Sequence, residues 1–285
     1  MKGDHTITAN ASPENDLLCA EGKPDIKKVW SEIRGEARRV IESEERLATL
    51  IEDIFMSRES LACAVAARLS RKLAREDMTR EELLPLLQEL LIGHPELVGS
   101  MASDLIAINE RDPACHSLMQ PLLFYKGFMA IATYRLSHQL WKNDRHDLAL
   151  YFQSLSSEIF GVDIHPAARI GCGILLDHAT SFVVGETAII EDNVSILHEV
   201  TLGGTGKMTG DRHPIVRSGV MIGAGSKILG RVEIGRGAKI GAGSVVLDDV
   251  APHKTVAGVP AIVVGTSPSE NPAEAMDQSL SCSGI

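Results

Sequence analysis

The chain has 285 residues, more than one domain usually contains, so two domains or one domain with a large extension are expected. Hydrophobic residues make up 44% of the chain and aromatic residues only 4%, which favours a core of aliphatic side chains in a regular stack. The net charge of −10 argues against a nucleic acid or an anionic membrane as a partner, because both attract a basic surface.

The sequence lacks the patterns of a secreted or membrane-spanning protein. Its first ten residues, MKGDHTITAN, are polar, and no apolar run reaches the roughly 18 residues that cross a bilayer. The five cysteines are scattered without a CxxC pair, so neither a zinc ribbon nor a disulfide framework is expected. We therefore expect a cytoplasmic protein.

Residues 1–24 form a polar extension to which the sequence assigns no role, and residues 25–160 are expected to form a helical domain. From residue 26 to residue 55, apolar residues recur mostly at spacings of three and four between charged ones, which predicts an amphipathic helix. Ser57 is expected to cap a second helix, because serine often occupies the position before a first helical turn.

Thr79 and Glu82 have the spacing of a capping box, which predicts the start of a third helix. Pro85 lies too deep for the first turn and is expected to kink or interrupt that helix. Two further helical runs are predicted at residues 122–141 and 148–160.

From residue 161 to residue 265 the chain follows a different period. Aliphatic residues recur every six positions, at Ile164, Ile170, Leu176, Val184, Ile190, Ile196, Leu202, Val216, Ile222, Ile228, Ile234, Ile240 and Val246. Neither an α-helix nor a single strand has this period, and glycine often follows the aliphatic residue. The pattern predicts a parallel β-helix built from short repeats.

Two interruptions break the six-residue period. The first is a slip of two residues near Phe182 and Val183, and the second is a polar, glycine-rich insert between Leu202 and Val216. A stacked solenoid has no structural need for such an insert, and loops on rigid scaffolds often carry function. We therefore look for a functional site near these two positions.

Histidine is the side chain best suited to take a proton from a hydroxyl group near neutral pH. The repeat half contains five candidates, which are His165, His178, His198, His213 and His253. The repeats resemble those of the hexapeptide-repeat proteins, and this resemblance implies coils of about 18 residues. In such coils Asp163 and His178 fall on neighbouring rungs near one corner, where the carboxylate could orient the ring. His198 occupies the same place in its repeat as His178 and should stack about one coil away. Its role stays open between the active site and a plain turn.

The motifs DIHPAARIG, LDHATSFVVGET, VTLGGTG and GDRHP in the repeat half, together with RDPAC in the helical half, resemble the serine acetyltransferases. This family belongs to the hexapeptide-repeat acyltransferases, whose coils wind left-handed. The resemblance implies an α+β protein with an N-terminal helical domain, a left-handed parallel β-helix at residues 161–265 and a disordered C-terminal tail. It also implies acetyl transfer from acetyl-CoA to the hydroxyl of L-serine, the first step of cysteine biosynthesis from serine, with no permanently bound cofactor.

The resemblance assigns roles to particular residues of this chain. It makes His178 the general base, with Asp163 as its partner. The serine site would consist of Asp112, Asp177, Arg212 and His213, and the CoA site would include Gly204, Thr205, Ala224, Lys239 and Ala242. A cation for the carboxylate and anions for the ammonium group suit a zwitterionic substrate.

The family also forms trimers through the β-helix, and often pairs two trimers through the helical domains. Residues 266–285 are polar and rich in serine and proline, so we expect a flexible tail. The resemblance implies that Ile285 at its end binds O-acetylserine sulfhydrylase, with an ordinary frayed terminus as the alternative. It further implies feedback inhibition by L-cysteine at the serine site.

Three other functions remain open from the sequence. The first is acetyl transfer to another acceptor, such as a sugar or an antibiotic. The second is a zinc hydratase of the γ-carbonic anhydrase type, in which His178, His198 and His213 could supply three nitrogen ligands between subunits. The third is a catalytically silent scaffold that only regulates the sulfhydrylase. The pairing of Asp163 with His178 and the GGTG segment favour acetyl transfer over these alternatives.

Overall fold

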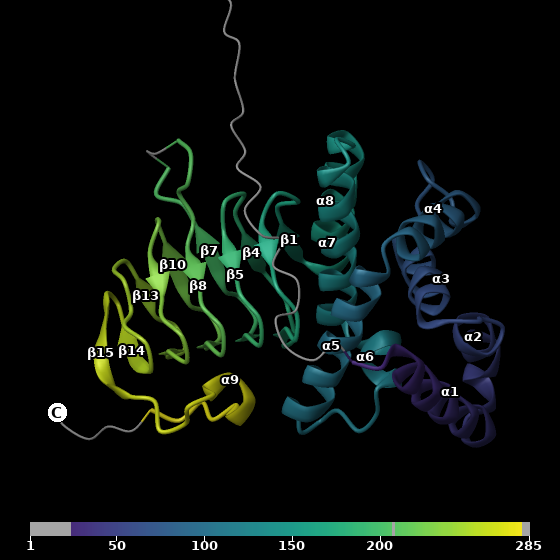
Figure 1. Ribbon diagram of the computed structural model, residues 1–285, viewed down its shortest axis with the longest axis horizontal. Helices are drawn as coiled ribbons and strands as arrows, with labels where there is room; N and C mark the ends of the chain where they lie inside the picture. Colours follow the sequence, from purple (N-terminus) through teal and green to yellow (C-terminus); the bar gives the residue numbers. More distant parts are fainter. Residues whose placement is uncertain (1–23, 207–208, 281–285) are drawn as a thin grey trace, which may run out of the picture.

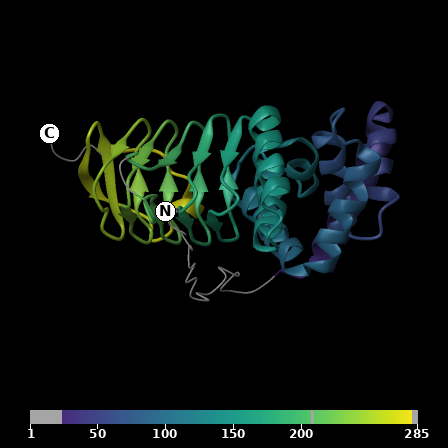
Figure 2. The same cartoon turned by 90° about the horizontal axis from the view of Figure 1, so that it is seen from above.

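The computed structural model describes residues 24–206 and 209–280, which form a helical domain followed by a β-helix (Figure 1). Figure 2 shows that the helices gather at one end of an elongated molecule and that the coils of the β-helix follow one another toward the other end. The main helices are α1 (Ile26–Ser43), α2 (Ala48–Ile51), α3 (Leu61–Leu73), α4 (Arg80–Gly93), α5 (Pro95–Arg111), α6 (Met119–Phe124), α7 (Lys126–Lys142), α8 (His146–Phe160) and α9 (Pro272–Ala275).

The single helix predicted for residues 26–55 is divided in the structure. Asp25 caps α1 through its carboxylate, and α1 ends at Ser43, before a 3-10 turn (Glu45–Leu47), α2 and a π-helical turn (Glu52–Met56). The prediction that Ser57 caps the next helix is wrong. Ser57 donates a hydrogen bond back to the carbonyl of Glu52, and Ser60 caps α3 by accepting from the amide of Cys63.

The capping box of α4 is confirmed, because the Glu82 carboxylate accepts hydrogen bonds from the amide and the hydroxyl of Thr79. The expected interruption at Pro85 is wrong, since α4 continues through this residue to Gly93. Four leucines of α4 are buried on both sides of the proline, which holds the helix in place although one backbone hydrogen bond is missing. These leucines are Leu83, Leu87, Leu90 and Leu91.

The predicted β-helix is confirmed as three sheets that form the sides of a prism, and all their strands are parallel except the last one. Sheet A contains β1 (Val162–Ile164), β4 (Phe182–Val184), β7 (Thr201–Gly203), β10 (Lys227–Leu229) and β13 (Val245–Val246). Sheet B contains β2 (Arg169–Ile170), β5 (Ile189–Ile190), β8 (Ile215–Val216) and β11 (Glu233–Ile234). Sheet C contains β3 (Leu175–Leu176), β6 (Ser195–Ile196), β9 (Met221–Ile222), β12 (Lys239–Ile240), β14 (Lys254–Gly258) and β15 (Ala261–Thr266).

The aliphatic ladder fills the prism and sets the register of the coils. In sheet A, Ile164 lies beside Val184, Val184 beside Leu202 and Leu202 beside Ile228, so ladder residues pair with ladder residues. The two interruptions therefore fall at corners of the prism. The slip lengthens the turn before β4, and the insert leaves the prism between β7 and β8.

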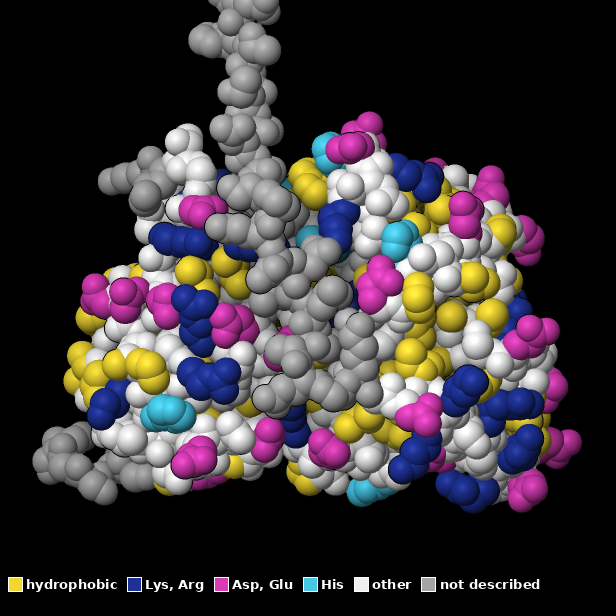
Figure 3. All heavy atoms as spheres, in the orientation of Figure 1, with side chains coloured by type: hydrophobic (Ala, Val, Ile, Leu, Met, Phe, Trp, Pro, Cys, Tyr) yellow, Lys and Arg dark blue, Asp and Glu magenta, His cyan; other side chains and the backbone are white. Residues whose placement is uncertain are grey.

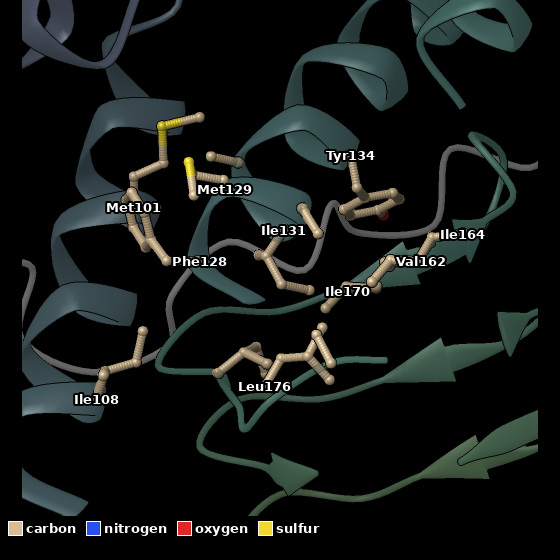
Figure 4. Packing of buried hydrophobic residues seen from close by; sticks show 14 of the residues in the cluster. Met101, Ile108, Phe128, Met129, Ile131, Tyr134, Val162, Ile164, Ile170 and Leu176 are labelled. Atoms are coloured by element: carbon tan, nitrogen blue, oxygen red, sulfur yellow. The ribbon is translucent and has the colours of Figure 1, made fainter. Parts of the chain in front are cut away.

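One hydrophobic core joins the helical domain to the first coil. Figure 4 shows Phe128, Ile131 and Tyr134 of the helical domain near Ile170 and Leu176 of the first coil. Because each of these residues is at most 6% exposed, the two parts share one packed interior.

Buried polar contacts fix the orientation of this junction. Arg135 of α7 forms a bidentate salt bridge with Asp104 of α5 at 2.9 and 3.0 Å, and also donates to the carbonyl of Gly171 at 2.7 Å. The Asp104 carboxylate in turn accepts from the amide of Ile174 at 2.9 Å. A charged pair this deeply buried contributes orientation, because any other arrangement would leave a charge without a partner.

The described part of the expected flexible tail lies against the β-helix, which differs from the sequence prediction. Ala273 of α9 is fully buried, and its carbonyl accepts a hydrogen bond of 2.7 Å from the hydroxyl of Ser195 in sheet C. Farther along, the ammonium of Lys239 donates to the carbonyl of Ser279 at 2.6 Å. Residues 266–280 thus cover part of sheet C, while residue 285 lies outside the described residues.

The far end of the β-helix is closed by the antiparallel pair β14 and β15. Figure 3 shows hydrophobic side chains gathered over this end, and Val259, Ile262 and Val263 are 60 to 72% exposed. Cys63 and Cys115 are free thiols. None of the described helices is both long and apolar enough to cross a membrane.

Candidate active site

The candidate residues occupy two corners of the prism that flank sheet A. At the corner between sheets C and A, called the His178 corner, the turns carry His178, His198, Ala224 and Ala242. The register places these four residues in one column, because each follows by two positions the aligned ladder residues Leu176, Ile196, Ile222 and Ile240. At the corner between sheets A and B, called the His213 corner, the turns carry His165, Glu186, Arg212 and His213.

A pocket of about 390 Å³ lies between the helical domain and the His178 corner. Asp112, at the C-terminal end of α5, and Asp177 and His178, in the turn after β3, line this pocket together. The structure therefore brings together three of the predicted site residues from distant parts of the chain. The side chain of His178 is 75% exposed, so a substrate can reach its ring.

The electrostatics of this pocket are dominated by two carboxylates. Burial raises the pKa of Asp177, the nearby carboxylate of Asp112 raises it further, and the neighbouring His178 lowers it. Burial also raises the pKa of Tyr125 to about 12, with contributions from Cys115 and the two aspartates. An ammonium group would relieve the repulsion between these carboxylates, so the pocket is suited to a cationic ligand group.

The turn that carries His178 is strained. His178, Ala179 and Ser181 all have φ angles between 55° and 62°, in the left-handed region that non-glycine residues seldom adopt. Neighbouring groups hold this turn in place: the ammonium of Lys126 donates to the hydroxyl of Thr180, and the amide of Ser181 donates to the carbonyl of Gly161 at 2.8 Å. Strain of this kind persists where the surroundings impose it, and it often marks a functional site.

Asp163 lies on β1, one coil before His178, on the outward face of sheet A. Its carboxylate accepts a hydrogen bond of 2.6 Å from the amide of Gln153 on α8. The carboxylate of Asp177 lies close to His178, with its Oδ1 atom 3.8 Å from Nε2 of the ring. The pairing of Asp163 with His178 stays a prediction.

The His213 corner holds the second group of predicted residues. His213 is 7% exposed and packs against Gly185 and Gly204, where a Cβ atom at Gly185 would overlap its ring. Its Nδ1 accepts a hydrogen bond of 3.1 Å from the amide of Thr187 and lies 2.9 Å from the hydroxyl of that residue. Because Nδ1 acts as an acceptor, the proton of the neutral ring is assigned to Nε2. Thr187 thereby fixes the tautomer of His213.

Arg212 is oriented by an ion pair. Its guanidinium lies 2.6 Å from the Glu186 carboxylate and donates to the carbonyl of Gly210 at 3.1 Å. The arginine in turn lowers the pKa of Glu186 and, after the larger effect of burial, that of His213. This corner therefore presents a fixed cation next to a neutral imidazole.

The residues predicted to bind CoA fall into two groups. Ala224 and Ala242 continue the column of the His178 corner, where their small side chains leave the backbone accessible. Gly204 and Thr205 lie at the start of the insert, beside the His213 corner. Lys239, a further candidate, is 3% exposed, and its ammonium donates a hydrogen bond to the carbonyl of Ser279 in the tail.

Sequence reasoning missed several residues at both corners. Lys126 lies in the pocket beside His178, and Glu186 and Thr187 orient Arg212 and His213. The spacing of the repeats predicts which coil contains Glu186 and Thr187, but it does not predict which side chains they contact. Lys126 precedes the coils by many residues, so no repeat pattern could have placed it near His178.

The zinc alternative finds no support within one chain. His178 and His198 share a corner, but His213 lies at the other edge of sheet A. Within residues 24–206 and 209–280, no group of three histidine, cysteine, aspartate or glutamate side chains is arranged to hold a metal ion.

Comparison with protein families matches residues 29–133 to the model of the serine acetyltransferase N-terminal domain and residues 213–248 to the bacterial transferase hexapeptide repeat. A curated relative, the serine acetyltransferase of Salmonella typhimurium, is 51% identical over 254 residues, which cover 89% of this chain and 93% of the relative. The hexapeptide match and the solved relatives agree with a left-handed β-helix, so the predicted fold class is confirmed.

Solved structures of similar proteins include complexes with three small molecules. A serine acetyltransferase from Brucella abortus in complex with coenzyme A is 49% identical, with a TM-score of 0.83, and the match covers 84% of this chain and 96% of that one. Soybean serine acetyltransferase complexed with serine is 50% identical, with a TM-score of 0.82, over 85% of this chain and all of that chain. A serine acetyltransferase in complex with cysteine is 49% identical, with a TM-score of 0.87, over 89% of this chain and 98% of that one.

Proposed function

The chain belongs to the serine acetyltransferase family, and we propose that the pocket at its His178 corner is where an acetyl group passes from acetyl-CoA to L-serine. The enzyme is a transferase, its products are O-acetyl-L-serine and CoA, and the reaction begins the synthesis of cysteine from serine. Acetyl-CoA is a co-substrate and not a resident cofactor. The single observation that carries the location is the convergence of Asp112, Asp177 and His178 on one pocket.

His178 acts as the general base in this proposal. Its exposed ring takes the proton from the serine hydroxyl, and the serine oxygen forms a bond to the carbonyl carbon of the thioester. The bond between that carbon and the CoA sulfur then breaks, and the imidazolium returns the proton to the departing thiolate. The acetyl group thus passes directly to serine, and the proton taken by His178 goes to CoA, so no covalent enzyme intermediate forms.

The two ends of serine would be recognised by different corners. The carboxylates of Asp112 and Asp177 suit the ammonium group, and the guanidinium of Arg212 suits the carboxylate, with His213 beside it. These two groups lie at opposite edges of sheet A within one chain. We therefore place the complete site between two chains, with the His178 corner of one chain facing the His213 corner of its neighbour.

A trimer around sheet A would join the corners in this way. Both corners flank this sheet, so packing three copies of sheet A around an axis brings each His178 corner next to a neighbouring His213 corner. Val183 on the outward face of sheet A and Leu247, directly after β13, are exposed, whereas part of sheet C is covered by α9 and the tail. A second trimer joined through the helical domains would give the hexamer that the sequence resemblance implied.

Acetyl-CoA would approach along the small residues of the His178 column. Ala224 and Ala242 leave room for the pantetheine arm to lie against the backbone, with Gly204 and Thr205 of a neighbouring chain on its other side. Lys239 can reach the CoA phosphates only if its ammonium leaves Ser279. The solved relative with coenzyme A supports this class of co-substrate.

The acceptor is tested by following thiol release from acetyl-CoA with a panel of amino acids and sugars. Serine is expected to support turnover far better than the other acceptors, and His178→Ala is expected to lower kcat by about 100-fold or more, because general bases contribute 10²–10⁴-fold. Turnover of a sugar in preference to serine would refute the acceptor. Near wild-type turnover of His178→Ala in a protein with an unchanged melting temperature would refute the base.

Two further expectations accompany this function. L-Cysteine is expected to compete with serine, since a solved relative holds cysteine and both amino acids present the same charged ends. The terminal Ile285 is expected to bind O-acetylserine sulfhydrylase, and unchanged binding after its deletion would refute this. The cytoplasmic location expected from the sequence stays a prediction.

A further inference from the structure

His198 is the one imidazole of the His178 corner for which the reaction described above gives no role. It lies one coil below His178, and the centroids of the two rings are 5.8 Å apart with an angle of 84° between their planes. This edge-to-face geometry is the arrangement that favours contact between two flat rings. The two rings therefore restrain each other's orientation.

The backbone of His198 is fixed from both sides. Its carbonyl accepts a hydrogen bond of 2.9 Å from the amide of Gly225 in the coil below. The amide of the next residue, Glu199, donates at 2.7 Å to the carbonyl of Thr180 in the His178 turn, and Glu199 itself has a φ angle of 59°. The ring is thus attached to a rigid part of the coil, and the same hydrogen bonds tie its backbone to the strained turn of His178.

The ring also lies between the two proposed binding regions. It contacts the ring of His178, which lines the pocket together with Asp112 and Asp177. Below it, the same column continues with the small side chains of Ala224 and Ala242. The column therefore changes from imidazole rings to methyl groups directly below His198, where the acceptor pocket meets the proposed path of the pantetheine arm.

The hydrogen bonding of the ring nitrogens indicates how the His198 side chain is held. Nδ1 of His198 is buried and makes no hydrogen bond with the described protein atoms, whereas Nδ1 of His213 accepts one from Thr187. The two histidines thus differ: His213 is held through a nitrogen, and His198 is held through its backbone and its ring contact. Loss of the ring, rather than loss of a nitrogen, is expected to matter at His198.

We propose that His198 is a positioning residue for acetyl transfer: its ring packs edge to face against His178 and keeps that base directed at the junction between acceptor and thioester. The inference rests on the proposed function of His178. It differs from a turn role, because a turn residue would affect folding and not the rate of the chemical step. It also differs from a binding role, because a residue that binds serine would change KM, whereas a residue that orients the base changes kcat.

The experiment compares His198→Ala, which removes the ring, with His198→Phe, which keeps a flat ring without nitrogens. His198→Ala is expected to lower kcat about 3- to 10-fold, the factor that corresponds to the energy of one aromatic pair. The KM values for serine and acetyl-CoA should stay within about twofold of wild type. His198→Phe should recover most of kcat. The matched control is His146→Ala, which removes an imidazole that packs on Trp141 at 4.2 Å in the helical domain and should leave kcat unchanged.

Several results would overturn the proposal. Wild-type kcat for His198→Ala would show that the ring positions nothing. A loss that appears only as a higher KM would assign the residue to binding, and a loss in His198→Phe as large as in His198→Ala would assign the effect to a nitrogen. If both variants lost kcat and also had a clearly lower melting temperature than the wild type, the effect of His198 would be assigned to folding. Absence of serine acetylation by the wild-type enzyme would instead refute the proposed function, so the two failures can be told apart.

Discussion

At the scale of single residues, the site depends on side chains whose protonation states are set by their neighbours. The tautomer of His213 is fixed by Thr187, and its ring is buried against two glycines next to Arg212. Burial and the adjacent cation both disfavour the imidazolium, which is why the pKa of His213 is lowered. The neutral ring can then donate from Nε2 to a substrate oxygen.

This lowered pKa predicts how stability depends on pH. The unfolded chain, in which a histidine titrates near 6.5, binds a proton before the folded chain does, so the free energy of unfolding should fall as the pH decreases below about 6.5. His165 shares this behaviour, since burial also lowers its pKa. His213→Gln should remove part of the fall. The measurement is urea denaturation between about pH 5 and pH 8.

The exposed His146 provides the control for this series. His146→Gln is expected to leave the pH dependence of unfolding as it is in the wild type. A steeper loss of stability at low pH in His213→Gln than in the wild type would contradict the assignment of His213 as a neutral buried ring.

At the scale of elements, the position of the site depends on how closely α7 approaches the first coil. Gly127, in the first turn of α7, faces the carbonyl of Leu176 at such short range that a Cβ atom would overlap the oxygen. The next turn of the coil carries Asp177 and His178, and Lys126 reaches Thr180 from the same end of α7. A glycine is therefore needed where helix and coil meet.

Gly127→Ala is predicted to destabilise the protein by about 1–3 kcal/mol, the usual cost of overpacking, because the obstacle is backbone and cannot rotate away. It should also lower kcat, since the pocket would widen between Lys126 and His178. The control is Gly35→Ala in α1, where nothing lies within 4 Å of the added methyl group. That variant should stabilise α1 by about 0.5–1 kcal/mol. Thermal unfolding of both variants, with activity measured in parallel, checks the pair, and equal stabilities would refute the close approach.

At the scale of the whole molecule, the β-helix separates the two halves of the site by the width of one sheet. The His178 corner holds the proposed base and the two aspartates, and the His213 corner holds the guanidinium of Arg212. Under the proposed function, these two groups of one chain are too far apart to bind the same small substrate. Assembly around sheet A is therefore expected to be required for activity.

This expectation predicts complementation between two inactive variants. In trimers that contain both His178→Ala and Arg212→Ala chains, some sites combine the intact His178 of one chain with the intact Arg212 of its neighbour. Random mixing would make about one site in four intact, so coexpression should restore about a quarter of wild-type activity. Each variant alone should stay nearly inactive.

The mixed trimers can be isolated with two different affinity tags before activity is measured. Mixed trimers that are as inactive as the single variants would contradict a site shared between chains. Full activity of a protein shown to be monomeric would contradict it as well.

The amino-acid sequence by itself determined the fold class, and it predicted where along the chain the chemistry takes place. A period of six cannot arise from a helix or a flat strand, so the aliphatic ladder specifies the β-helix. The slip and the insert mark the two corners at which we propose the site. The capping box of Thr79 and Glu82 could also be predicted from the sequence, because the two residues lie three positions apart. Local spacing suffices where the interacting groups are neighbours in the chain.

Only the tertiary structure decided which distant groups meet. The approach of Lys126 and Asp112 to the His178 turn, the ion pair of Glu186 with Arg212 and the cover that the tail gives to sheet C all join residues from different coils or domains. The continuation of α4 through Pro85 also depended on packing, since burial of leucines on both sides of the proline outweighs its local preference. Contacts of this kind depend on how the helical domain docks on the first coil and on how loops and tail fold back on the coils, and no spacing within the sequence encodes either.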